Sequence, residues 1–154
     1  MATTTKSLTI ANAQDLLSLS QAELDKLYRN SPLGDIPVGD TKGTAILIPK
    51  SPFGMIATWL IRLLVWQGKV FSPAQRDLKN KVSPFGLKAI RAMVYVGDSW
   101  LIQGQKAIVI DYSKTSFVAQ KIRDEIRQVA PRLYLGKVFW GHKHLLDFSL
   151  SLER

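Results

Sequence analysis

The chain has 154 residues, which is enough for one domain with a sizeable core and too few for two. A hydrophobic content of 46% with 21% charged residues excludes a disordered or low-complexity protein. The absence of cysteine excludes disulfides, thiolate catalysis and cysteine metal sites, and it fits a reducing compartment. Because the first ten residues also lack the apolar stretch of a signal peptide, we expect a cytoplasmic protein.

The charge is unevenly distributed along the chain. Residues 1–40 carry three basic and five acidic side chains, whereas the remainder carries 18 basic and seven acidic ones. A basic body predicts attraction to an anionic partner: nucleic acid, an anionic membrane surface or a carboxylate-bearing ligand. The alternative is that the charge only keeps a small protein soluble.

Residues 1–40 are predicted to form a helical extension that docks on a body comprising residues 41–154. Ser20 and Glu23 have the spacing of a capping box, in which each side chain satisfies a backbone donor beside the other. Leu24, Leu27 and Tyr28 then form an apolar stripe at helical spacing, and Pro32 follows the helix.

Residues 53–66 are apolar on nearly every face of a predicted helix. The segment is too short to span a membrane, which requires about 20 residues. A helix of this kind must be buried or lie against a ligand or lipid. We expect it to pack at one end of the body, with a lid over a cavity and a helix resting on a membrane as alternatives.

From Gly68 onward the apolar pattern changes to alternation, which indicates short antiparallel strands separated by turns. Strands are predicted at residues 43–48, 69–71, 78–82, 88–96, 106–112 and 133–140. Residues 115–126 are ambiguous, and we favour a short helix near 115–121 followed by a strand. The last strand alternates without an error, which predicts one buried and one solvated face. Its apolar residues are Leu146, Phe148, Leu150 and Leu152, and its polar residues are Asp147, Ser149, Ser151 and Glu153.

The segment Trp66-Gln67-Gly68-Lys69-Val70-Phe71, followed by strands at 92–97, 109–112, 129–136 and 148–154, resembles small bacterial calycin-type, lipocalin-like proteins. The resemblance covers about residues 43–154. It implies an eight-stranded up-and-down β-barrel around an apolar cavity. Relatives of this kind bind fatty acids, retinoids, haem or other hydrophobic molecules, and a few catalyse their cyclisation or isomerisation. The predicted fold is therefore mainly β: an antiparallel calycin-like barrel with an N-terminal helical extension and an apolar helix at one end.

The predicted ligand-binding residues are aromatic and basic side chains that a barrel could direct inward. They are Trp59, Trp66, Lys69, Phe71, Arg91, Tyr95, Tyr112 and Tyr134. If Arg91 and Tyr95 face the cavity, they could hold a carboxylate between them. If Ala92 and Val94 face inward instead, Arg91 is solvated, and the register decides between the two.

Two further groups have a structural and a chemical interpretation. Asp111, Tyr112 and Lys114 could act as acid, base and oxyanion partner, or could simply end a strand. His142 and His144 could approach one metal or a haem, or could lie solvated in a turn, which is the interpretation we favour. No phosphate loop, zinc spacing or catalytic triad order is present in the sequence.

The sequence thus predicts a protein that binds a small hydrophobic ligand, with or without a carboxylate, in a barrel cavity and requires no metal or cofactor. A cofactor-independent cyclase or isomerase acting in the same cavity is the alternative, and peripheral contact with a membrane is a third hypothesis. Nucleic acid is disfavoured because most aromatics occupy apolar positions, and because Asp124 and Glu125 interrupt the most basic stretch.

Overall fold

A computed structural model describes the backbone of residues 9–46, 68–72, 77–82, 87–114 and 120–152, and the side chains of these residues except 68–70, 77–82 and 87–91. The predicted apolar helix at 53–66, with Trp59 and Trp66, lies outside the described residues. So do residues 115–119, where we expected a short helix.

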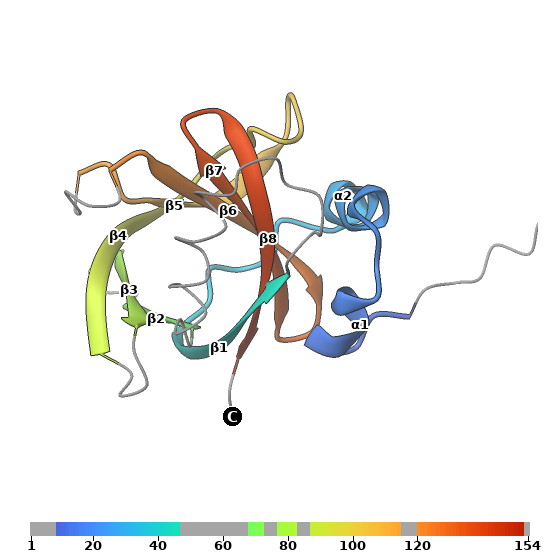
Figure 1. Ribbon diagram of the computed structural model, residues 1–154, viewed down its shortest axis with the longest axis horizontal. Coiled ribbons are helices and arrows are strands. Elements are labelled where there is room, and N and C mark those ends of the chain that lie inside the picture. Colours follow the sequence, from blue (N-terminus) through green and yellow to red (C-terminus); the bar gives the residue numbers. More distant parts are fainter. Residues whose placement is uncertain (1–8, 47–67, 73–76, 83–86, 115–119, 153–154) are drawn as a thin grey trace, which may run out of the picture.

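Eight antiparallel strands form a closed barrel in which each strand pairs with the next and β8 pairs with β1 (Figure 1). The strands are β1 (Gly39–Ile46), β2 (Gly68–Ser72), β3 (Asp77–Val82), β4 (Leu87–Asp98), β5 (Lys106–Asp111), β6 (Ile122–Ala130), β7 (Leu133–Trp140) and β8 (Lys143–Leu152). The predicted antiparallel barrel is therefore confirmed. Such a meander needs only short connections, in keeping with the turn-separated alternation of the sequence.

Strand boundaries differ from the predicted ones at three places. β1 begins at Gly39, four residues earlier than expected, because residues 39 and 40 pair with β2 while residues 41–46 pair with β8. β4 continues through Gly97 and Asp98, which pair with β5, so the turn comes later than expected. The ambiguous stretch contains a turn at 120–121 and then β6, as the favoured interpretation has it from residue 122 onward.

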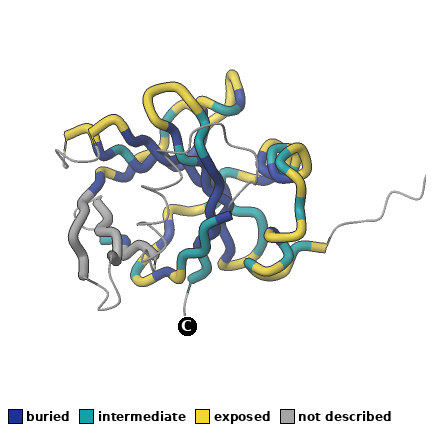
Figure 2. Tube along the Cα trace, in the orientation of Figure 1, coloured by how far each residue is buried: buried dark blue, intermediate teal, exposed yellow. Residues whose placement is uncertain are grey.

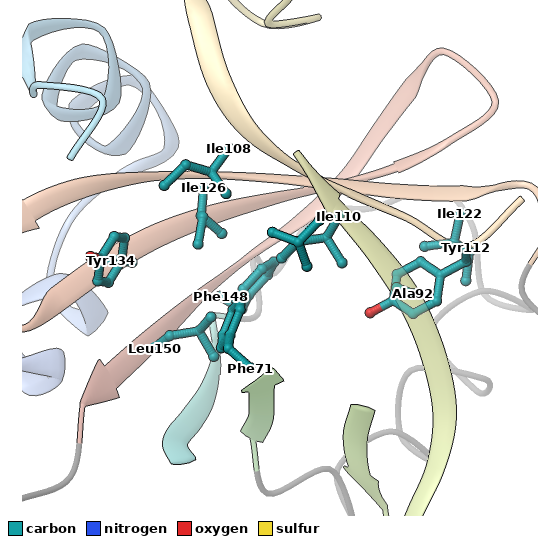
Figure 3. Packing of buried hydrophobic residues seen from close by; sticks show 11 residues of the cluster. Phe71, Ala92, Ile108, Ile110, Tyr112, Ile122, Ile126, Tyr134, Phe148 and Leu150 are labelled. Atoms are coloured by element: carbon teal, nitrogen blue, oxygen red, sulfur yellow. The ribbon is translucent and has the colours of Figure 1, made fainter. Parts of the chain in front are cut away.

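The barrel interior is lined by apolar side chains contributed by most of the strands. Because successive residues of a strand point to opposite faces, Phe148 and Leu150 of β8 enter this cluster and Leu152 packs against it. Figure 3 shows Phe148 and Leu150 beside Phe71 in its middle. The cluster comprises Phe71, Ala92, Val94, Ile108, Ile110, Tyr112, Ile122, Ile126, Tyr134, Phe148 and Leu150.

Two helices precede the barrel, α1 (Ala13–Leu17) and α2 (Gln21–Asn30). The capping box of Ser20 and Glu23 is confirmed: the Ser20 hydroxyl accepts from the Glu23 amide, and the Glu23 carboxylate accepts from the Ser20 amide. The helices lie against the outside of β1, β6 and β8. Their buried side chains Leu16, Leu24 and Tyr28 form a second apolar cluster with Leu133 and Leu135 of β7.

The polar face of β8 is not solvated, contrary to the prediction from its alternation. Asp147 and Ser149 are both 0% exposed, because the helices cover the outer face of the barrel at this point (Figure 2). Alternation correctly separates the two faces of a strand. It does not distinguish water from a covering layer that is itself polar.

Gly136 of β7 is required by the packing of the interior. A Cβ atom at this position would lie 2.1 Å from Cζ of Phe148, so the phenylalanine ring rests directly on the glycine backbone. A glycine within a strand is typical of such a close approach.

We expect Gly136→Ala to lower the free energy of unfolding by about 1–3 kcal/mol, because the added methyl group would displace the buried Phe148 ring. In a Phe148→Leu background the same change should cost less, because the ring that it meets is gone. Denaturant unfolding of the two single variants and the double variant measures this coupling. Additive costs would contradict the packing described.

Candidate functional site

Three of the predicted ligand-binding residues lie in the barrel interior. Phe71, Tyr112 and Tyr134 all belong to the inner cluster and are at most 3% exposed. In Figure 3 the rings of Tyr112 and Tyr134 lie on opposite sides of this cluster. The interior therefore has an apolar middle with a phenol towards each end.

The register of β4 places Tyr95 outside the barrel, so of the two alternatives for this strand the one with Ala92 and Val94 facing inward is observed, and Tyr95 does not line the interior. Ala92 and Val94 are buried in the inner cluster, whereas Met93 and Tyr95 are 41% and 40% exposed. The Tyr95 hydroxyl donates to Oδ2 of Asp111 at 3.3 Å, and partial burial together with the Asp111 charge raises the pKa of the phenol. Arg91 belongs to β4 but its side chain is outside the described set.

Lys69 belongs to β2, where its backbone pairs with Asn80 of β3, and its side chain is also outside the described set.

Asp111 and Tyr112, which we considered together as acid–base partners, point to opposite faces of the barrel wall. Asp111 contacts Tyr95 on the outside, whereas Tyr112 is in the interior.

The inner face also carries a carboxylate that sequence reasoning missed. Asp124 of β6 is 4% exposed and lies opposite Ile110 of β5, on the same face as the inner cluster. The Tyr112 hydroxyl donates to Asp124 Oδ2 at 3.3 Å. Adjacent acidic residues in a basic stretch indicate a solvated surface, but strand parity sends Asp124 inward and Glu125 outward.

The barrel end at the β6–β7 turn is crossed by residues 31–38, which connect α2 to β1. Leu33 packs against the inner cluster, and the Tyr134 hydroxyl donates to the Asp35 carbonyl at 2.5 Å. Gly34 has a φ of +74° and approaches Gln128 so closely that a Cβ atom would lie 2.4 Å from the Gln128 Cβ. We call this the closed end. Burial and the nearby Asp35 charge raise the pKa of Tyr134, which keeps its hydroxyl a donor.

Charged side chains buried on the outer barrel wall hold helix α2 in place. Residues 31–38, which cross the closed end, follow this helix directly. Lys137 of β7 is 0% exposed, and its Nζ lies 2.7 Å from Asp25 Oδ1 and 2.6 Å from Asp147 Oδ2. Gln21 of α2 donates to the same two carboxylates, at 2.7 and 3.1 Å. His144 Nε2 lies 2.6 Å from the second oxygen of Asp147. A buried ion pair needs such additional hydrogen bonds to offset its desolvation.

Glu125 joins the same helix to the β4–β5 loop. This carboxylate is 0% exposed and accepts from the Tyr28 hydroxyl at 3.0 Å and the Ser99 hydroxyl at 2.5 Å. The Trp100 amide and the Nη1 atom of Arg123 donate to the other carboxylate oxygen of Glu125, Oε2, each at 2.8 Å. Burial and the Glu125 charge raise the pKa of Tyr28 far above its usual range, so this phenol remains a donor.

The two histidines do not converge on a metal among the described residues, where no cluster of three suitable ligands occurs. His144 pairs with Asp147, whereas His142 stacks on the Trp100 ring with 4.3 Å between centroids. Among the same residues, no helix is long and apolar enough to cross a membrane.

Neither a family model nor a curated protein matches the sequence. One solved structure, described as "Crystal structure of protein from Thermomonospora curvata", superposes with a TM-score of 0.67 at 19% sequence identity. The match covers 88% of this chain and 89% of that one. At this identity the likeness shows a shared antiparallel, barrel-like β fold.

The ion pair of Asp25 with Lys137 should make stability pH-dependent. Although burial opposes it, the Lys137 ammonium holds the pKa of Asp25 below the ordinary value of an aspartate. The stabilisation should therefore be fully present above about pH 4 and be lost as the pH falls through the lower folded-state pKa.

We expect Asp25→Asn to lower the free energy of unfolding by about 1–2 kcal/mol at pH 7, with the difference from wild type shrinking below about pH 4. Urea unfolding across a pH series measures this. The exposed Asp35→Asn is the control. A constant Asp25→Asn difference at every pH would contradict the assignment.

Proposed function

We propose that this protein is a calycin-like carrier that holds a small hydrophobic ligand inside its barrel. The observation that carries the proposal is the inner wall, which is apolar in its middle, closed at one end by residues 31–38, and polar at the Tyr112–Asp124 pair. An interior of eight strands has room for packed side chains or one small ligand.

Affinity would come from the apolar lining. Removing apolar surface from water contributes about 25 cal/mol per Å², so a ligand seated among isoleucine and phenylalanine side chains needs few polar contacts to bind. The closed end supports this role, because Tyr134 and Leu33 limit how far a ligand could enter from the opposite side. Sites of this kind orient an apolar ligand with a small number of polar groups.

The Tyr112–Asp124 pair would provide those polar groups. The Tyr112 hydroxyl donates to Asp124 Oδ2 at 3.3 Å on the inner face of the barrel. We propose a hydrophobic ligand with a polar group, such as a hydroxyl or an amide, that hydrogen-bonds to this pair.

Native mass spectrometry of the full chain, followed by organic extraction of what co-purifies with it, tests the proposal directly. We expect a bound apolar molecule, or saturable uptake of an environment-sensitive apolar fluorophore that long-chain alcohols displace. A protein that carries no such molecule and binds neither the fluorophore nor the alcohols would contradict the proposal.

Tyr112→Phe should weaken binding of a long-chain alcohol by about 5–10-fold while leaving the matching hydrocarbon unaffected, because one hydrogen bond is lost and the apolar contacts remain. Isothermal titration of both ligands measures this. Tyr95→Phe makes the same chemical change on the outer wall and serves as the matched control. Equal losses for alcohol and hydrocarbon would show that Tyr112 acts through packing alone.

A further inference from the structure

Among the side chains that the structure describes, two tryptophans are exposed on the barrel. Trp100 in the β4–β5 loop is 40% exposed, and Trp140 at the end of β7 is 39% exposed. An indole has an apolar body and one polar N–H, so it is well suited to a boundary between apolar and aqueous phases. Neither indole lies in the apolar clusters beneath the barrel wall or the helices.

Both tryptophans lie at the end of the barrel that carries the β7–β8 turn. The ring of His142, in the β7–β8 turn, lies 4.3 Å from the ring of Trp100, and Trp140 precedes the same turn and pairs with Lys143. The Gly141 amide donates to the Lys121 carbonyl at 3.0 Å, which joins the start of β6 to this turn. Figure 1 shows the β4–β5 loop and the β7–β8 turn together at the top of the molecule. We call this the tryptophan–lysine surface: Trp100, Lys121, Trp140, His142 and Lys143.

The charge of this surface is positive. Lys121 and Lys143 are exposed, and neither residues 112–122 nor residues 138–146 contain an aspartate or a glutamate. The exposed Asp98, two residues before Trp100, is paired with Lys106 at 2.5 Å. The whole chain carries a formal net charge of +9, which adds a long-range attraction for anions.

The Trp100 indole is held in place before any partner arrives. Its backbone amide donates to Glu125 Oε2 at 2.8 Å, and Phe139 meets its ring edge to face at 5.6 Å. The Arg123 guanidinium lies over the ring, 4.1 Å from its centroid. Little conformational entropy would therefore be lost when this indole is inserted into another phase.

We infer that the tryptophan–lysine surface docks the protein on an anionic lipid bilayer. Indoles concentrate at the headgroup level of membranes, where both their apolar body and their N–H are accommodated. Lysines beside them are attracted to the negative surface of the leaflet, each contributing about fivefold in affinity near the surface. Exposed indoles with Lys121 and Lys143 beside the β7–β8 turn combine both requirements.

The occupied ring faces of Trp100 favour a bilayer over a nucleic acid. Binding to single strands depends on bases that stack on exposed aromatic faces. Here the Arg123 guanidinium and the His142 ring already stack against the Trp100 indole. The headgroup region requires no stacking and can accept the exposed ring edge.

Co-sedimentation with vesicles of phosphatidylcholine, alone or mixed with phosphatidylserine, tests the inference on the full chain. We expect binding only to the vesicles that contain phosphatidylserine, and a loss of binding as salt is raised. The double variant Lys121→Glu, Lys143→Glu should lower the partition coefficient by more than about tenfold. Trp140→Ser should also lower the partition coefficient. This loss should depend less on salt than the loss in the lysine variant.

Matched controls make the same changes elsewhere on the surface. Lys26→Glu with Lys42→Glu alters net charge equally, at exposed positions on α2 and β1. Leu17→Ser removes a comparably exposed apolar side chain, 44% exposed, from α1. Circular dichroism confirms that each variant folds.

Equal losses in the controls and in the surface variants would overturn the inference, because net charge alone would then explain binding. Absence of vesicle binding by the wild type would overturn it too. If the wild type instead bound a single-stranded oligonucleotide, and the double variant lost that binding, the surface would be a nucleic-acid site.

Discussion

The buried carboxylate of Glu125 is the constraint on which the arrangement outside the barrel depends. A charge removed from water must be paired and hydrogen-bonded, and this one receives donors from α2, from the β4–β5 loop and from its own strand. Helix α2 and the loop are thereby fixed to the same point of β6. An apolar contact would permit sliding, whereas hydrogen bonds to a fixed carboxylate define one position.

The two functional proposals concern opposite ends of the barrel, and both depend on this outer wall. Glu125 and Lys137 fix the position of α2, and therefore the point from which residues 31–38 start. From there these residues cross the closed end and contact Tyr134. With the loop fixed by Glu125, Trp100 is presented beside the β7–β8 turn. Charges that do not touch the proposed ligand thus position both the closing segment and the proposed docking surface.

Much of the barrel could be predicted, whereas the candidate site could be predicted only in part. Period-two alternation located β2, β3, β7 and β8, because a half-buried strand must alternate whatever it packs against. Phe71, Tyr112 and Tyr134 were correctly expected inside. The orientation of Tyr95 could not be decided from the sequence, because a shift of one residue exchanges the faces of a strand and residues 88–96 are compatible with either register. Asp124 was missed because an acidic pair in a basic stretch is indistinguishable from a solvated turn.

The sequence by itself determined an antiparallel, meandering β-sheet preceded by a capped helix, because alternation and capping are local and each is encoded within a few residues. Only the tertiary structure decided that β8 closes on β1, that residues 31–38 cross one end, and that Asp147 and Glu125 are buried. Those features depend on which residues from distant parts of the chain meet. The pairing of Glu125 with Tyr28, 97 positions earlier, leaves no periodic trace in the sequence.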